Sequence, residues 1–126
     1  MIRRTVPLRP LFWVGSSKRD YGHFPIHVQN QFGFELFLAQ TGQHPPSAKP
    51  LKGFGARVLE LTDEDDHGTY RTIYSLQFRD SIYVLHAFQK KSKRGIETPK
   101  RDLELIRQRL KAAEEHHAEL PKEEKL

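Results

Sequence analysis

Three β-forming segments in the second half of the chain restrict the fold more than any other feature of the sequence. Residues 57–61, 69–78 and 81–88 are rich in β-branched and aromatic side chains, which favour strands. An acidic turn, residues 63–68, separates the first two segments, and Arg79-Asp80 separates the last two. Because connections this short join neighbouring antiparallel strands, the sequence predicts a three-stranded antiparallel meander.

The part of the chain before this meander predicts one short strand and two helices. Apolar residues 11–14 are typical of an edge strand, and Ser17 can cap a helical turn that ends at Tyr21. A longer helix is predicted from Pro25 to the residue before Gly42, and residues 44–50 predict a loop. Apolar side chains recur at helical spacing in the longer helix, at Val28, Phe32, Leu36 and Ala39.

A final helix follows the meander, with Thr98 as the expected N-cap and Pro99 as its first residue. Its apolar stripe is Leu103, Ile106, Leu110 and Ala113. The order of elements predicts an α+β domain with N-terminal helices, a twisted antiparallel sheet and a C-terminal helix, the helices packing on one side of the sheet. We expect one domain over residues 1–120 and a flexible charged tail over residues 121–126.

The composition narrows the class of protein. The chain of 126 residues has no cysteine, which excludes disulfides and cysteine-ligated zinc, and no histidine pair has a spacing typical of a metal site. No apolar run has the length of a membrane span, and Pro7 and Pro10 interrupt the N-terminal apolar stretch. We therefore expect a cytoplasmic protein without contact with a membrane, and we expect no metal or other cofactor.

The charge is unevenly distributed. The formal net charge is +5, but residues 89–111 hold nine Lys or Arg against three acidic residues. The densest part is the basic segment, residues 89–95. A face this basic attracts polyanions, of which nucleic acid is the commonest, although a solvated charged helix gives the same count.

Three segments in order resemble a known family. They are residues 49–61 (KPLKGFGARVLEL), residues 68–71 (GTYR), and residues 83–92 (YVLHAFQKKS) followed by Thr98-Pro99. Together they resemble the phage-derived toxin family of the RelE/ParE/HigB superfamily. The resemblance implies a compact microbial RNase-type fold and a toxin of a type II toxin–antitoxin system, which cuts mRNA on the ribosome without metal. It also implies a small helix-turn-helix antitoxin as the partner, and it leaves the oligomeric state open.

Metal-free cleavage uses the 2′-hydroxyl of RNA as the nucleophile, so the site must bind the phosphate, remove one proton and supply another. The resemblance implies that Arg71 contacts the scissile phosphate; the alternative is that Arg71 pairs with the acidic residues 63–66. Arg57 is expected near Arg71 across the meander, as a second catalytic candidate. Lys90 and Lys91 are candidates for base or acid, because a lysine crowded by cations gives up its proton more readily.

Four further residues are candidates for RNA binding. Lys52, Lys93 and Arg94 would hold phosphates that flank the reacting bond, although residues 93–94 also fit a solvated loop. His86 is the fourth candidate, but its apolar neighbours in the strand favour a buried, hydrogen-bonded structural histidine.

Two positions leave the chemistry open. The resembled enzymes carry lysines in the strand where this chain has Val58 and Glu60, so the general base is not identified. Three functions remain: a ribosome-dependent mRNA endonuclease, a gyrase-inhibiting toxin of the ParE type, and an inactive RNA- or protein-binding module on the same fold.

Overall fold

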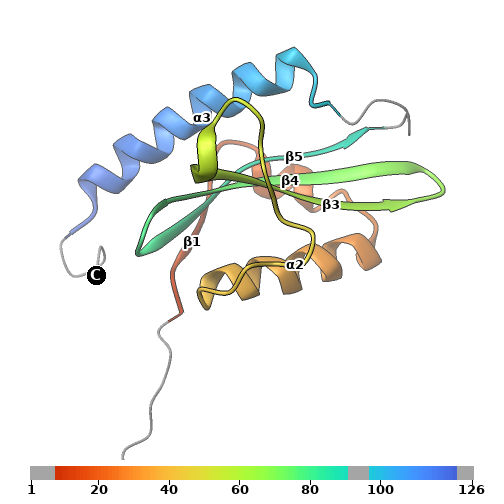
Figure 1. The fold of residues 1–126 in the computed structure, drawn as a ribbon, viewed down its shortest axis with the longest axis horizontal. Coiled ribbons are helices and arrows are strands. Elements are labelled where there is room, and N and C mark those ends of the chain that lie inside the picture. Colours follow the sequence, from red (N-terminus) through yellow and green to blue (C-terminus); the bar gives the residue numbers. More distant parts are fainter. Residues whose placement is uncertain (1–7, 91–96, 122–126) are drawn as a thin grey trace, which may run out of the picture.

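The computed structural model describes residues 8–90 and 97–121. A five-stranded sheet lies between two helical layers (Figure 1). In chain order the elements are β1 (Leu11–Trp13), α1 (Ser17–Tyr21), α2 (Ile26–Gln40), β2 (Lys49–Pro50), the 3-10 turn η1 (Gly55–Arg57), β3 (Val58–Asp65), β4 (Gly68–Phe78), β5 (Ser81–Lys90) and α3 (Lys100–Glu119). None of the helices in these ranges is long and apolar enough to cross a bilayer.

The predicted meander is confirmed. β4 pairs antiparallel with β3 and with β5, and the turns between them are Asp66-His67 and Arg79-Asp80. The first turn is shorter than the acidic turn predicted at residues 63–68, because β3 continues to Asp65. The Asp65 carboxylate accepts hydrogen bonds from the His67 amide and the Tyr70 hydroxyl, which stabilise the tight turn. Although partial burial acts in the opposite direction, these bonds hold the pKa of Asp65 below its ordinary value.

Two short strands extend the meander, giving the order β1-β5-β4-β3-β2. β1 lies at one edge, as expected for residues 11–14, but it runs parallel to β5. The residues predicted as a loop contribute β2 at the other edge, antiparallel to β3. The sheet is therefore mostly antiparallel rather than wholly so.

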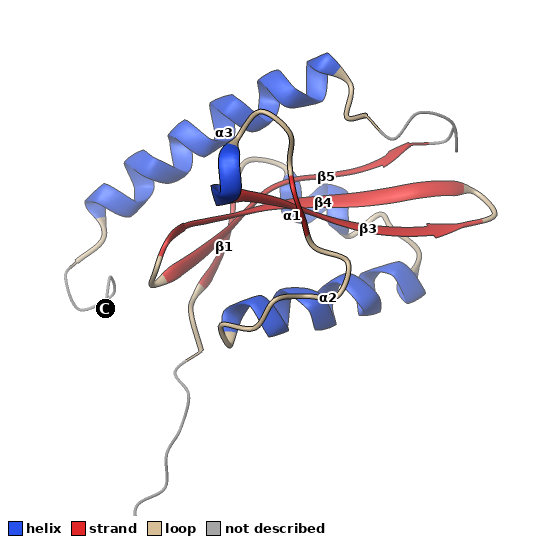
Figure 2. Ribbon diagram, in the orientation of Figure 1, coloured by secondary structure: helices blue, strands red, loops and turns tan. Residues whose placement is uncertain are grey.

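The helices cover both faces of the sheet (Figure 2), so the expectation that they pack on one side was wrong. Ile73 and Tyr74 are neighbours in β4 and belong to different clusters, and both are fully buried. Since successive side chains of a strand point to opposite faces, each apolar face of β4 needs its own cover. α2 packs on the Tyr74 face and α3 on the Ile73 face, with the apolar side chains predicted for each helix.

A buried carboxylate joins α2 to the segment that leads into β2. Glu35 is only 1% exposed, and its two oxygens accept hydrogen bonds from the amide and the hydroxyl of Ser47, at 3.1 and 2.6 Å. The Ser47 hydroxyl accepts in turn from the amide of Thr62 in β3. One carboxylate therefore fixes the crossing from the α2 face to the sheet edge.

The far end of α3 is attached to the turn between β4 and β5. The Tyr83 hydroxyl lies 2.7 Å from Nδ1 of His116, and Nε2 of His117 lies 2.9 Å from the Asp80 carboxylate. The His117 ring also stacks on Phe78 at a centroid distance of 3.8 Å. Both histidines therefore have structural contacts that attach α3 to β5 and to the turn before it.

Replacing the buried Glu35 with Ala leaves the amide and hydroxyl donors of the half-buried Ser47 without their acceptor. We expect the free energy of unfolding to fall by about 1–3 kcal/mol, measured by urea denaturation. Glu104→Ala, at an exposed position of α3, is the control and should change stability little. Equal effects of the two substitutions would contradict the role given to Glu35.

Burial, together with the charge of Asp80, raises the pKa of the Tyr83 hydroxyl to about 12 from its ordinary 10.0. The folded state therefore favours neutral Tyr83, and this contribution to stability is complete below pH 10.0 and is lost as the pH rises through about 12. Denaturation across this interval should show a steeper loss of stability for the wild type than for Tyr83→Phe. If stability fell equally with pH in the two proteins, the raised pKa of Tyr83 would be contradicted.

Candidate functional site

The most unusual side chain in the sheet is Arg71, an arginine buried in the central strand. It is only 4% exposed. One guanidinium nitrogen lies 3.0 Å from the Glu60 carboxylate in β3 and 3.2 Å from the Thr98 hydroxyl. The partner of Arg71 is thus Glu60, and the alternative pairing with residues 63–66 is wrong. The predicted N-cap role of Thr98 is also wrong, because Pro99 holds that position and the Thr98 hydroxyl lies among the side chains of the pair.

The strand register explains this pairing. Arg71 lies opposite Thr62, and Glu60 lies opposite Ile73, so Glu60 and Arg71 are diagonal neighbours on the α3 face. The Glu60 side chain is 13% exposed and the Arg71 side chain 5%. The two charges are almost fully shielded from solvent. Removing one partner of such a buried pair lowers the free energy of unfolding by about 3–5 kcal/mol.

Glu60 lines an open groove between the β2 region and the start of α3. We call it the Glu60 groove; its volume is about 530 Å³, and its lining residues are Pro50, Leu51, Lys52, Glu60, Glu97, Thr98 and Leu103. Lys52, a predicted RNA-binding residue, is therefore at this groove. Lys90 is close to its rim, since its ammonium group donates to the Glu97 carbonyl at 2.7 Å. The groove lining brings together two glutamates, a hydroxyl and the exposed Lys52, and Arg71 reaches it only as the buried partner of Glu60 and Thr98.

His86 is held by α3 from two sides. It is 6% exposed, and Nε2 lies 2.7 Å from the Asp102 carboxylate, while Nδ1 lies 3.5 Å from the Arg109 guanidinium. The Phe88 ring stacks on its imidazole at 4.8 Å. This is the buried, hydrogen-bonded environment favoured for His86, and contact with RNA stays a prediction.

A bulge in β5 puts His86 on this face. Ile73 pairs with His86 and Tyr74 with Val84, which leaves Leu85 as the extra residue. Leu85 then packs under α3, and its carbonyl accepts from Arg109 at 2.9 Å. Burial lowers the pKa of the Arg109 guanidinium. His86, Asp102 and Arg109 together fix the position of α3 relative to β5.

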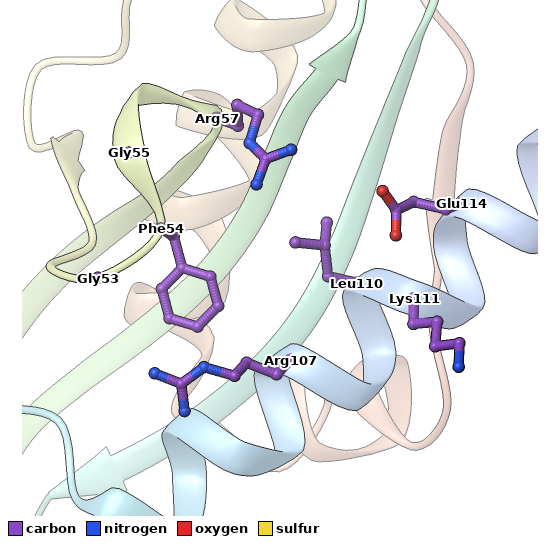
Figure 3. Close-up of a pocket in the computed structure, with 8 residues that line it drawn as sticks. All are labelled: Gly53, Phe54, Gly55, Arg57, Arg107, Leu110, Lys111 and Glu114. Carbon is purple, nitrogen blue, oxygen red and sulfur yellow. The ribbon is translucent and has the colours of Figure 1, made fainter.

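Arg57 lies in a different place from the one predicted. It ends η1 rather than beginning a strand, and Val58 after it pairs with Ser75. Ser75 is four residues beyond Arg71, a separation of roughly 13 Å along the strand. Arg57 instead lines a second groove of about 500 Å³ beside α3, which we call the Arg57 groove (Figure 3). The prediction that Arg57 and Arg71 lie close together was wrong.

The other members of the predicted site cannot be placed. Lys91, Lys93 and Arg94 lie outside the described residues, with most of the basic segment. Their catalytic and RNA-binding roles therefore stay predictions. Among residues 8–90 and 97–121, no group of three His, Asp or Glu side chains is arranged to hold a metal ion.

Sequence reasoning missed three residues that the structure brings to the site: Glu60, Thr98 as a partner of Arg71, and Asp102. The signal for Glu60 was present, because a glutamate between Leu59 and Leu61 in an apolar strand requires a partner when buried. The sequence held no comparable signal for Asp102, because its contact with His86 depends on the bulge in β5.

The family described as "Phage derived protein Gp49-like (DUF891)" matches residues 19–111. No curated protein matches. Among solved structures, the chain is similar to one in the crystal structure of the toxin–antitoxin complex RelBE2 from Mycobacterium tuberculosis, with 13% identity and a TM-score of 0.47, covering 71% of this chain and 100% of that one. Because the family match spans most of the sequence, the chain belongs to the phage-derived Gp49-like family (DUF891).

Proposed function

We propose that this chain is the toxin of a type II toxin–antitoxin system and that it cleaves mRNA on the ribosome without a metal ion. The observation that carries the proposal is the buried Arg71–Glu60 pair, whose Glu60 lines an open groove. Membership of a phage-derived family and the resemblance of three sequence segments to toxins agree with it.

In the proposed reaction Arg71 binds the non-bridging oxygens of the scissile phosphate. A guanidinium offers several donors in one plane and stays protonated, so it can stabilise the added negative charge but is not the base. Thr98 donates to Glu60 in the free protein at 3.4 Å, and it can redirect its hydroxyl to the phosphate.

Glu60 is the proposed general base. Its carboxylate accepts the proton of the 2′-hydroxyl as the 2′-oxygen attacks phosphorus. The bond from phosphorus to the 5′-oxygen then breaks, leaving a 2′,3′-cyclic phosphate, and the 5′-oxygen takes a proton from a neighbouring donor. Lys90 and Lys91 stay the candidates for this donor. His86 acts as a positioning residue, because its ring is already held by Asp102 and stacked on Phe88.

One observation favours a second candidate, a toxin of the same fold that does not cut RNA. Val58 is fully buried and Glu60 neutralises Arg71, so neither β3 position that is basic in the resembled enzymes carries a free cation here. A gyrase supercoiling assay separates this candidate from the nuclease. Inhibition of supercoiling, together with transcripts that stay intact after induction, would favour the toxin that does not cut RNA.

Arg71→Gln and Glu60→Gln test the nuclease. Arg71→Gln should reduce ribosome-dependent cleavage on the order of 10²–10³-fold through loss of charge stabilisation. Glu60→Gln should reduce it by roughly 10²–10⁴-fold through loss of the base. Cleavage is measured by mapping RNA ends after induction.

Arg79→Gln, at an exposed turn position, is the matched control and should cleave like the wild type. Because each site substitution breaks a buried pair, the double variant Arg71→Gln/Glu60→Gln checks that folding is preserved without the charges. Intact transcripts during a toxic induction of the wild type would rule out the nuclease.

The proposed protein partner, the antitoxin, fits the outer face of α2. Of the four exposed large apolar side chains in the described residues, Ile26, Phe34 and Phe37 lie on this helix. Its one charged residue, Glu35, is buried. An uncharged face with aromatic side chains is typical of the centre of a protein interface.

Phe34→Ser/Phe37→Ser should therefore weaken binding of the antitoxin encoded beside the toxin, by at least tenfold if the two rings are central to the interface. Copurification and calorimetry with that protein measure the change. Lys111→Ser on α3, on the other side of the sheet, is the control. Unchanged affinity of the double variant would place the antitoxin elsewhere.

A further inference from the structure

The Arg57 groove continues the Glu60 groove along α3. Residues 50–52 line the Glu60 groove, and the next three residues, 53–55, line the Arg57 groove. On the opposite side, Leu103 belongs to the first groove and Arg107, one helical turn later, to the second. The same segment and the same helix therefore border both grooves, which form one track on the α3 face.

The lining of the Arg57 groove has more cations than carboxylates. Arg57, Arg107 and Lys111 are all exposed, and none of them has an ion pair in the described part of the chain. The single carboxylate in the lining is Glu114, and one of its oxygens accepts a hydrogen bond from Gln77 at 2.7 Å. With three cations against one carboxylate, the lining of the groove has an excess of positive charge.

Part of this charge is held in place before any ligand arrives. The Arg107 guanidinium lies 5.1 Å from the centre of the Phe54 ring, a cation–π contact that limits its motion. Figure 3 shows the Arg57 and Arg107 side chains on either side of Phe54, with Leu110 between them and Glu114. Gly55, with φ of +68°, has no atom within 4 Å of where a Cβ would lie, so this wall stays open to a ligand.

We propose that the Arg57 groove is a second phosphate-binding site, which holds single-stranded RNA away from the reacting bond. The inference rests on the proposed function, since the strand would continue from the Glu60 groove. Two guanidinium groups can each bind phosphate oxygens in a plane, and the separation of roughly 13 Å along β4 requires an extended strand rather than one nucleotide. Continuity with the first groove favours RNA over an acidic protein segment.

The test measures binding of 2′-O-methyl RNA, which lacks the nucleophile, to the full chain at several salt concentrations. For a long oligonucleotide, Arg57→Ala/Arg107→Ala should lower affinity on the order of tenfold and reduce the salt slope by about 0.7 for each lost phosphate contact. A short oligonucleotide that fills only the Glu60 groove should bind as before. Arg57→Ala alone, which removes no internal contact, should shift the long oligonucleotide in the same direction by a smaller factor.

The matched control is Lys18→Ala/Arg79→Ala, which removes the same charge at exposed positions outside both grooves. Equal losses in the two double variants would overturn the proposal, because net charge alone would explain them. The proposal would also be overturned if Arg57→Ala/Arg107→Ala bound RNA as tightly as the wild type but no longer bound the antitoxin. The groove would then be a protein-binding site. If the wild type binds RNA through Arg57 and Arg107 but cleaves none on the ribosome, this inference stands and the proposed nuclease fails.

Discussion

The burial of β4 on both faces is the constraint on which the rest of the structure depends. A central strand covered by helices on either side has little room for charge, because an unpaired ion in such a position is costly. Arg71 is nevertheless placed there, and Glu60 from the neighbouring strand compensates it. Glu60 also lines an open groove, so the carboxylate side of the pair borders solvent while Arg71 stays buried.

The position of α3 decides whether that groove exists. The helix contacts the sheet through His86 and Asp102 near its start and through His116 and Tyr83 near its end. Arg109, between them, donates to the Leu85 carbonyl and to Ser16. These polar contacts set the position of the helix relative to residues 50–57. Both grooves lie between the helix and this segment.

Local patterns predicted the elements well, and long-range pairing explains where they did not. The spacing of Val28 and Phe32 identified α2, and the turn at Arg79-Asp80 identified the hairpin, because both signals are local. The parallel pairing of β1 with β5 and the cover on both faces depend on tertiary packing, which no local signal carries. The place of Arg57 was wrong for a similar reason: Arg57 directly precedes β3, and the register of β3 with β4 places that end of β3 opposite Ser75, four residues from Arg71.

The sequence pointed to a cationic site, but the structure adds a carboxylate at its centre. A phosphate that enters the Glu60 groove brings a second anion to Arg71, and the two anions then compete for one guanidinium. Transfer of a proton to the Glu60 carboxylate relieves the repulsion, and the 2′-hydroxyl of a bound RNA strand is a proton source at that point. In this view the absence of a lysine at position 60 does not remove the base from the proposed reaction. It makes proton uptake by Glu60 depend on the presence of the phosphate that Arg71 binds.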